Sequence, residues 1–182
     1  GKCSACKTPI SIRYPLVELA TALLFAATSW RFNGQPVTLV WAVFVSILVA
    51  ASMIDWDTTL LPDDLTFPLL WAGLLAALFG WTIPLNEAVT GAMVGYLSLW
   101  AVYWLFKLTT GKEGMGYGDF KLLALFGAWL GWQVLPLIIL LSSLVGAVIG
   151  IVLIVLKKQD ASRPIPFGPY LAAAGWLALA SR

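Results

Sequence analysis

The sequence predicts an all-α protein, a polytopic bundle of membrane helices with about seven spanning or re-entrant segments. Hydrophobic residues occupy 60% of the 182 positions, charged residues occupy only 11%, and the mean hydropathy is +0.90. Soluble domains usually carry about 25% charged residues, so this composition indicates an integral membrane protein. Many of the 10 Trp lie near the ends of apolar runs, as expected at the membrane–water interface. The net charge of +2 is too small to suggest nucleic-acid binding.

The apolar runs follow one another along the chain, with short polar connections between them. A helix needs about 20 mostly apolar residues to cross a bilayer. The fifth and seventh runs are shorter, so we expect them to be tilted, partly buried or re-entrant. The connections 33–36 and 163–169 are read as ordinary turns. The expected helices are 14–30, 37–54, 65–84, 88–106, 120–133, 134–156 and 167–180.

Lysine and arginine predict the orientation of these helices. With the N-terminal segment in the cytoplasm and every run crossing, nine of the 11 basic residues fall on the cytoplasmic side and two on the far side. Cytoplasmic loops carry an excess of Lys and Arg, so this topology is favoured. The cytoplasmic set is Lys2, Lys7, Arg13, Lys107, Lys112, Lys121, Lys157, Lys158 and Arg163, and the other two are Arg31 and Arg182.

The same topology brings two acidic loops, 54–64 and 109–121, to the cytoplasmic face. Asp55 ends one uncharged run and Asp119 opens another. An ionisable residue in such a place is costly and therefore a functional hypothesis, although each aspartate alone also fits a helix end in the headgroup region. The loops hold six of the nine acidic residues, namely Asp55, Asp57, Asp63, Asp64, Glu113 and Asp119.

Two carboxylates that face each other would form a protease dyad. Like charges a few ångströms apart do not both ionise readily, so the pair shares one proton. The ionised member then activates water, and the protonated member polarises the scissile carbonyl and helps to protonate the leaving amine. The sequence has no histidine, which excludes Ser-His catalysis and HExxH zinc chemistry from these residues. Peptide hydrolysis by two aspartates is the protease chemistry that this composition leaves most open.

Glycines alternate just before the second of these aspartates, at Gly114, Gly116 and Gly118. Glycine permits positive φ and leaves no side chain in the way, so an extended substrate backbone would approach closely here. A flexible loop explains the same glycines equally well. A phosphate-binding loop is excluded, because the spacing GxxxxGK[ST] is absent.

A C-x-x-C pair, Cys3 and Cys6, lies in the N-terminal segment "KCSACK". Two thiolates supply half of a tetrahedral zinc site. The other two ligands would have to come from outside this sequence, because it contains two Cys and no His. A disulfide or an unligated pair fits the same pattern equally well.

Three small-xxx-small patterns recur in the apolar runs, at 91–95, 127–131 and 146–150. Small residues at this spacing let membrane helices approach closely. We interpret these glycines as helix-packing residues and assign them no chemistry.

The segments "IDWDTTLLPDDLTFPLLWAGLL" and "GMGYGDFKLLALFGAWLGWQ", with "GKCSACKTPISIRYPLVELATALLF" and "IPFGPYLAAAGW", resemble the type IV prepilin peptidase family. These are membrane aspartyl proteases of the GxGD class, and the chain is similar to their C-terminal catalytic portion. The resemblance implies that Asp55 and Asp119 are the two catalytic aspartates. It also implies that Asp63 of the "LPD" segment supports the site, and we expect Gly116 and Gly118 to do the same.

The resemblance further implies a membrane aspartyl endopeptidase that cleaves the basic leader from type IV prepilins and pseudopilins. Cleavage is expected at the cytoplasmic face of the bacterial inner membrane, with N-methylation of the mature N-terminus by the full-length protein, using S-adenosylmethionine. Family members carry two C-x-x-C pairs, and Cys3 and Cys6 look like the second. The first pair, the first transmembrane helix and most of the cytoplasmic domain are missing from this sequence. Residues 1–13 are thus expected to end a cytoplasmic, zinc-binding segment, and 14–182 to form the membrane peptidase domain.

Two other classes of protein remain as alternatives. A transport protein would use the acidic loops as a cytoplasmic cation entrance, but it is expected to place carboxylates near the middle of the bilayer, in broken helices. A non-enzymatic assembly subunit of a secretion system would explain the packing glycines, but not two acids beside a glycine loop.

Overall fold

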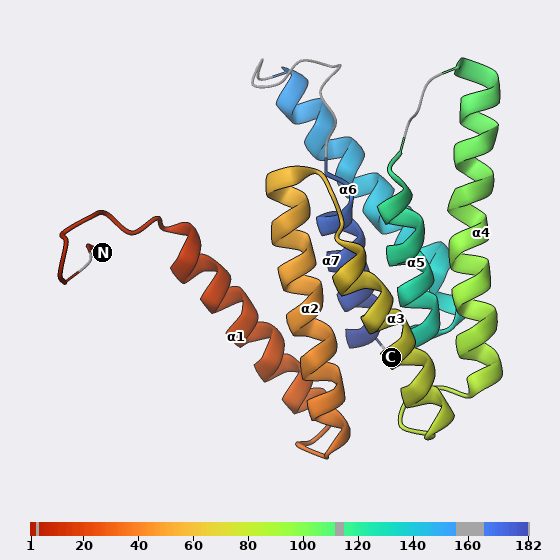
Figure 1. Cartoon of the computed structure of the whole chain (residues 1–182), viewed down its shortest axis with the longest axis horizontal. Helices are drawn as coiled ribbons and strands as arrows, with labels where there is room; N and C mark the ends of the chain where they lie inside the picture. Colours follow the sequence, from red (N-terminus) through yellow and green to blue (C-terminus); the bar gives the residue numbers. More distant parts are fainter. Residues whose placement is uncertain (3, 112–114, 156–165, 182) are drawn as a thin grey trace. The chain divides into compact units, whose positions relative to one another are not determined.

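The computed structural model describes residues 1–2, 4–111, 115–155 and 166–181. These residues fall into two compact units, Gly1–Ser46 and Ile47–Arg182. Within the described ranges the regular structure is helical, with no β-strand (Figure 1). The prediction of an all-α helical protein is therefore confirmed.

The helices follow the predicted apolar runs closely. Their ends differ most at α3, which stops well before the predicted residue 84, because Gly80 adopts φ +71° and the chain turns there. The helices are α1 (Arg13–Arg31), α2 (Val37–Thr58), α3 (Asp63–Leu78), α4 (Leu85–Thr110), α5 (Tyr117–Leu130), α6 (Leu135–Val155) and α7 (Gly168–Ala180).

Three helical segments of the described chain are long and apolar enough to cross a membrane: Val37–Thr58, Leu85–Thr110 and Trp132–Val152. Helices α5 and α7 have 14 and 13 residues. At 1.5 Å per residue each is only about 20 Å long, shorter than the roughly 30 Å of hydrocarbon in a bilayer. The sequence predicted both of these helices to be short.

The first unit contains α1 and the first ten residues of α2. Phe32, just after α1, stacks on Trp41 with ring centroids 5.5 Å apart. Trp41 in turn meets Phe44 edge-on at 5.4 Å. These aromatic contacts stabilise the turn between the two helices.

Helix α5 is the core of the second unit, and every residue from Asp119 to Leu130 except Lys121 is buried. It packs on α4 at Gly127, where an added Cβ on either Gly91 or Gly127 would overlap the other's backbone. A Cβ on Gly95 would lie 2.6 Å from the Leu123 carbonyl oxygen. The packing role predicted for these glycines therefore agrees with the contacts between α4 and α5.

Two further glycines let α5 pack against its other neighbours. Gly73 of α3 faces Trp129, whose Nε1 donates a hydrogen bond of 2.8 Å to the Leu69 carbonyl of α3. Gly175 of α7 leaves room for the ring of Phe126. Helix α5 is thus held against α3, α4 and α7 (Figure 1), and its first turn has a defined place among their ends.

Candidate active site

Asp55 lies in the last turn of α2 and is only 4% exposed. Its Oδ2 accepts a hydrogen bond of 3.0 Å from the backbone N–H of Gly168, the first residue of α7. The first N–H groups of a helix have no partner inside the helix and carry a partial positive charge. Asp55 satisfies one of them, so this buried carboxylate has an oriented donor.

Gly168 allows this contact because it has no side chain. A Cβ at this position would lie 2.7 Å from Oδ2 and 3.1 Å from Cγ of Asp55. The sequence had suggested an ordinary turn for the segment 163–169, of which 163–165 lie outside the described residues. Gly168 and Pro169, which the expected helix 167–180 also includes, begin α7, and Gly168 reaches the candidate site, a role that the sequence does not predict. Proline just inside a helix start was the available signal.

Asp119 is the third residue of α5 and is 7% exposed. Burial, and then the charge of the Asp55 carboxylate, raise the pKa of Asp119 from 3.8 to about 7, although a hydrogen bond from the Gly116 backbone partly offsets them. The structure therefore places Asp119 within electrostatic reach of Asp55. The two residues are 64 positions apart in sequence and come from different helices.

The glycines before Asp119 have two different roles. Gly116 caps α5 with φ −82° and ψ 150°, and Gly118 lies inside the helix, so neither uses the positive φ that glycine permits. A Cβ on Gly118 would lie 2.8 Å from the Leu61 Cβ, so this position is set by close packing. At Gly116 the nearest atom to an added Cβ is Asp119 Oδ2, at an ordinary 3.9 Å. Gly114 lies outside the described residues.

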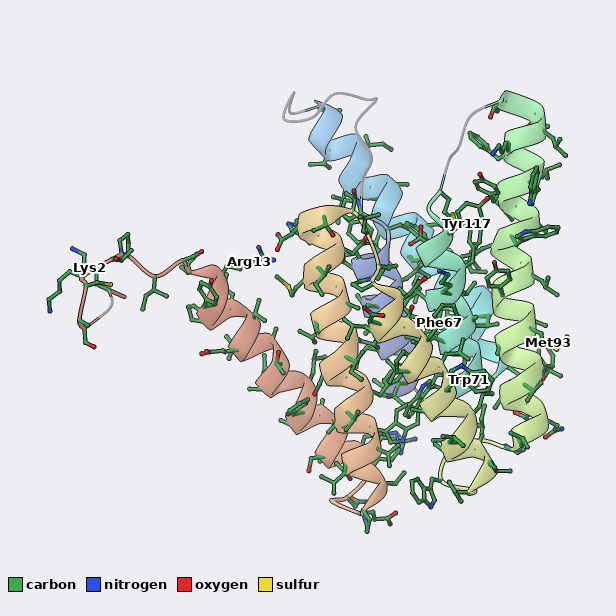
Figure 2. All side chains as sticks on the ribbon, in the orientation of Figure 1. Lys2, Arg13, Phe67, Trp71, Met93 and Tyr117 are labelled. Atoms are coloured by element: carbon green, nitrogen blue, oxygen red, sulfur yellow. The ribbon has the colours of Figure 1, made fainter. Side chains whose placement is uncertain are left out.

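Asp63 begins α3 and pairs with Lys121 of α5. The Lys121 Nζ lies 2.6 Å and 2.8 Å from the two Asp63 carboxylate oxygens, and 5.1 Å from the centre of the Phe67 ring. Phe67 is on α3, as Figure 2 shows. The Asp63 side chain is 53% exposed, so it is engaged at the surface and is not enclosed with Asp55 and Asp119. It connects the starts of α3 and α5.

An aromatic cluster lies beside the first turn of α5, and the sequence reading did not find it. The Tyr103 ring of α4 is 5.3 Å from Tyr117 and 5.6 Å from Phe120. Lys107 Nζ is 3.1 Å from the Tyr103 hydroxyl and 5.4 Å from its ring centre. Figure 2 shows Tyr117 between the first turn of α5 and α4. These contacts fix the start of α5, two residues before Asp119.

The cysteine pair gives no support for zinc in this chain. Cys3 lies outside the described residues, and Cys6 is exposed with its sulfur 3.1 Å from the Thr8 hydroxyl. Among the described residues, no group of three or more His, Cys, Asp or Glu side chains could hold a metal ion. The described residues thus give no support for zinc, and the half-site with Cys3 and Cys6 stays a prediction.

Two buried aspartates on different helices of a helical bundle define a candidate aspartyl hydrolase site. Comparison with known families gives the more specific assignment. The type IV leader peptidase family matches residues 42–151, which contain both aspartates. The bacterial peptidase A24 N-terminal domain matches residues 1–32. The chain belongs to the type IV leader peptidase family.

Similar curated proteins carry the name prepilin leader peptidase/N-methyltransferase. The protein from Stutzerimonas stutzeri is 61% identical over 98% of this chain, and the one from Pseudomonas aeruginosa is 59% identical over 98%. The protein from Pectobacterium carotovorum is 49% identical over 96% of the chain. The chain spans 62–63% of the length of these relatives. No solved structure matches it.

Proposed function

We propose that this protein is a membrane aspartyl endopeptidase that cleaves the basic leader from type IV prepilins and pseudopilins. Asp55 and Asp119 are the proposed catalytic residues. The observation that carries the proposal is a pair of buried carboxylates, in which burial and then the charge of Asp55 raise the pKa of Asp119 to about 7. The names of the similar proteins support the choice of substrate.

The proposed mechanism uses one proton shared by the two carboxyl groups. The ionised carboxylate removes a proton from water, and the resulting hydroxide attacks the scissile carbonyl carbon. The protonated carboxyl group donates a hydrogen bond to the carbonyl oxygen, where negative charge develops. The tetrahedral intermediate then collapses, the C–N bond breaks, and the leaving nitrogen receives a proton. Water is consumed, and one acid and one amine are formed.

The proposed site lies at the cytoplasmic face of the bacterial inner membrane. The support is the bias of basic residues toward the loops on that side, together with the position of both aspartates near helix ends. A prepilin has a charged leader beside an apolar helix, so its cleavage junction would meet the protein at this surface. The proposed peptidase domain is 14–182, with 1–13 as the end of a cytoplasmic segment.

N-methylation of the new N-terminus is proposed for the full-length protein only. The support is the name that the similar proteins carry, and S-adenosylmethionine is the methyl donor that the family resemblance implied.

The direct test uses membranes that contain the full-length protein and a purified prepilin, with product masses as the readout. Asp55→Asn and Asp119→Asn should each lower the cleavage rate by more than about a thousandfold, because neither variant can cycle a proton between two carboxyl groups. Asp64→Asn is the matched control, since Asp64 is an exposed carboxylate in the first turn of α3. Normal cleavage by either dyad variant would refute the proposed mechanism.

A further inference from the structure

Leu61, in the connection between α2 and α3, lies against the first turns of two other helices. A Cβ added at Gly118 of α5 would lie 2.8 Å from the Leu61 Cβ. A Cβ added at Gly168 of α7 would lie 3.3 Å from the Leu61 Cδ1. One side chain therefore touches both the turn that carries Asp119 and the turn that donates to Asp55. Leu61 therefore bridges these two turns.

The backbone N–H of Gly168 is a hydrogen-bond donor to one of the two carboxylates, that of Asp55. It donates to Asp55 at 3.0 Å, from the start of α7. A hydrogen bond to a carboxylate favours the charged form over the protonated form. The donor is backbone, so it is held by the helix and needs no rotamer to be fixed. Burial disfavours the charged form of both aspartates, and Asp119 also has a backbone donor, at Gly116.

We propose that Gly168 and Leu61 are positioning residues of the active site. Gly168 holds Asp55 as the carboxylate that activates water, and Leu61 packs against the first turns of both α7 and α5 beside the dyad. Asp119 is then the member that carries the shared proton at the start of the cycle. This inference rests on the proposed peptidase function and adds to it a separate role for each aspartate.

Gly168→Ala is the informative change, because its Cβ would meet the Asp55 carboxylate and push the donor away. Loss of a hydrogen bond to a charged group should lower kcat for prepilin cleavage by about 10- to 100-fold. KM should change by less than about twofold, since Gly168 is not proposed to touch substrate. A carboxylate without its N–H donor binds a proton more readily, so the acid limb of the kcat/KM profile should move to higher pH by about one unit.

The matched control is Gly146→Ala, in α6. Its Cβ would lie 3.5 Å from the Tyr170 ring and 3.6 Å from the Phe167 ring, ordinary contacts with the same end of α7. This variant should leave the pH profile in place. The same shift in Gly146→Ala would overturn the inference, because a methyl group that neither displaces the Gly168 donor nor alters Leu61 would then suffice.

Leu61→Ala is the second variant, and it introduces no clash. It should shift the acid limb in the same direction, with a smaller loss of kcat of about three- to tenfold, because α7 is less firmly held. If Gly168→Ala does not yield folded protein, an unchanged acid limb in folded Leu61→Ala overturns the inference. Failure of the proposed function looks different: the unsubstituted protein would cleave no prepilin, or Asp55→Asn would remain active.

Discussion

Replacing Asp119 by asparagine should abolish cleavage and at the same time stabilise the fold at neutral and higher pH. The pKa of Asp119 rises from 3.8 to about 7 on folding, mainly through burial. The folded state therefore holds this proton more tightly than the unfolded state. Below about pH 4 the residue is protonated in both states and does not lower the free energy of unfolding. Its destabilising effect grows as the pH rises from about 4 to about 7.

The size of the effect follows from that rise in pKa. Each pKa unit corresponds to about 1.4 kcal/mol, so ionising Asp119 in the folded protein costs up to about 4 kcal/mol above pH 7. Asparagine is close in shape to aspartate and uncharged. At pH 8 the free energy of unfolding of Asp119→Asn should therefore exceed that of the unsubstituted protein by most of this amount. At pH 4 the variant and the unsubstituted protein should be about equally stable.

The assay is unfolding in mild detergent at pH 4, 6 and 8, with prepilin cleavage measured on the same samples. Asp64→Asn is the control, because that carboxylate is exposed and lies outside the proposed dyad. A dead Asp119→Asn variant that is also less stable at pH 8 would refute the reasoning. The residue would then be a structural one, and its loss of activity would follow from misfolding.

Three other substitutions probe the framework of the site. Gly91→Ala should destabilise the protein by about 1–3 kcal/mol in detergent unfolding, because its Cβ would overlap the Gly127 backbone. Asp63→Asn should cost less than about 1 kcal/mol of stability, since its ion pair with Lys121 is half exposed, but should lower kcat severalfold by loosening the start of α5. Trp129→Phe should cost about 1–3 kcal/mol, because a buried carbonyl of α3 loses its donor.

Each of these predictions has an outcome that would contradict it. Gly91→Ala as stable as Gly146→Ala would mean that α4 and α5 separate without penalty. Lys121→Met, which removes the other partner of the exposed ion pair, should match Asp63→Asn in kcat. A difference of more than about tenfold between these two variants would show that one residue acts outside the pair.

The helices could be predicted because apolar runs of this length have few other structures available in a membrane. The exact ends of the helices could not be predicted, because they depend on single residues. Gly80 stops α3 early, and Gly111 ends α4 in the left-handed conformation at φ +69°. Asp55 was read as the end of its helix, yet α2 continues to Thr58 and keeps the carboxylate inside the last turn.

The two aspartates could be proposed from sequence because acidic residues are rare in so apolar a chain and both fell on one predicted face. Their surroundings could not be proposed, because they come from distant segments. The Gly168 donor is 113 positions from Asp55, and Lys121 is 58 positions from Asp63. Such pairs meet only in the folded chain, and neither periodicity nor composition contains that information.

The unequal lengths of α4 and α5 set the depth at which the chemistry would take place. The Tyr103 ring lies level with Tyr117 at the start of α5, and α4 continues beyond it to Thr110 (Figure 1). That overhang is about 10 Å at 1.5 Å per residue. A polypeptide that approached along the projecting end of α4 would need about three extended residues to bring a peptide bond to Asp119. A chain that stays helical up to that end would be out of reach, so local unwinding of the incoming helix would select which bonds are cut.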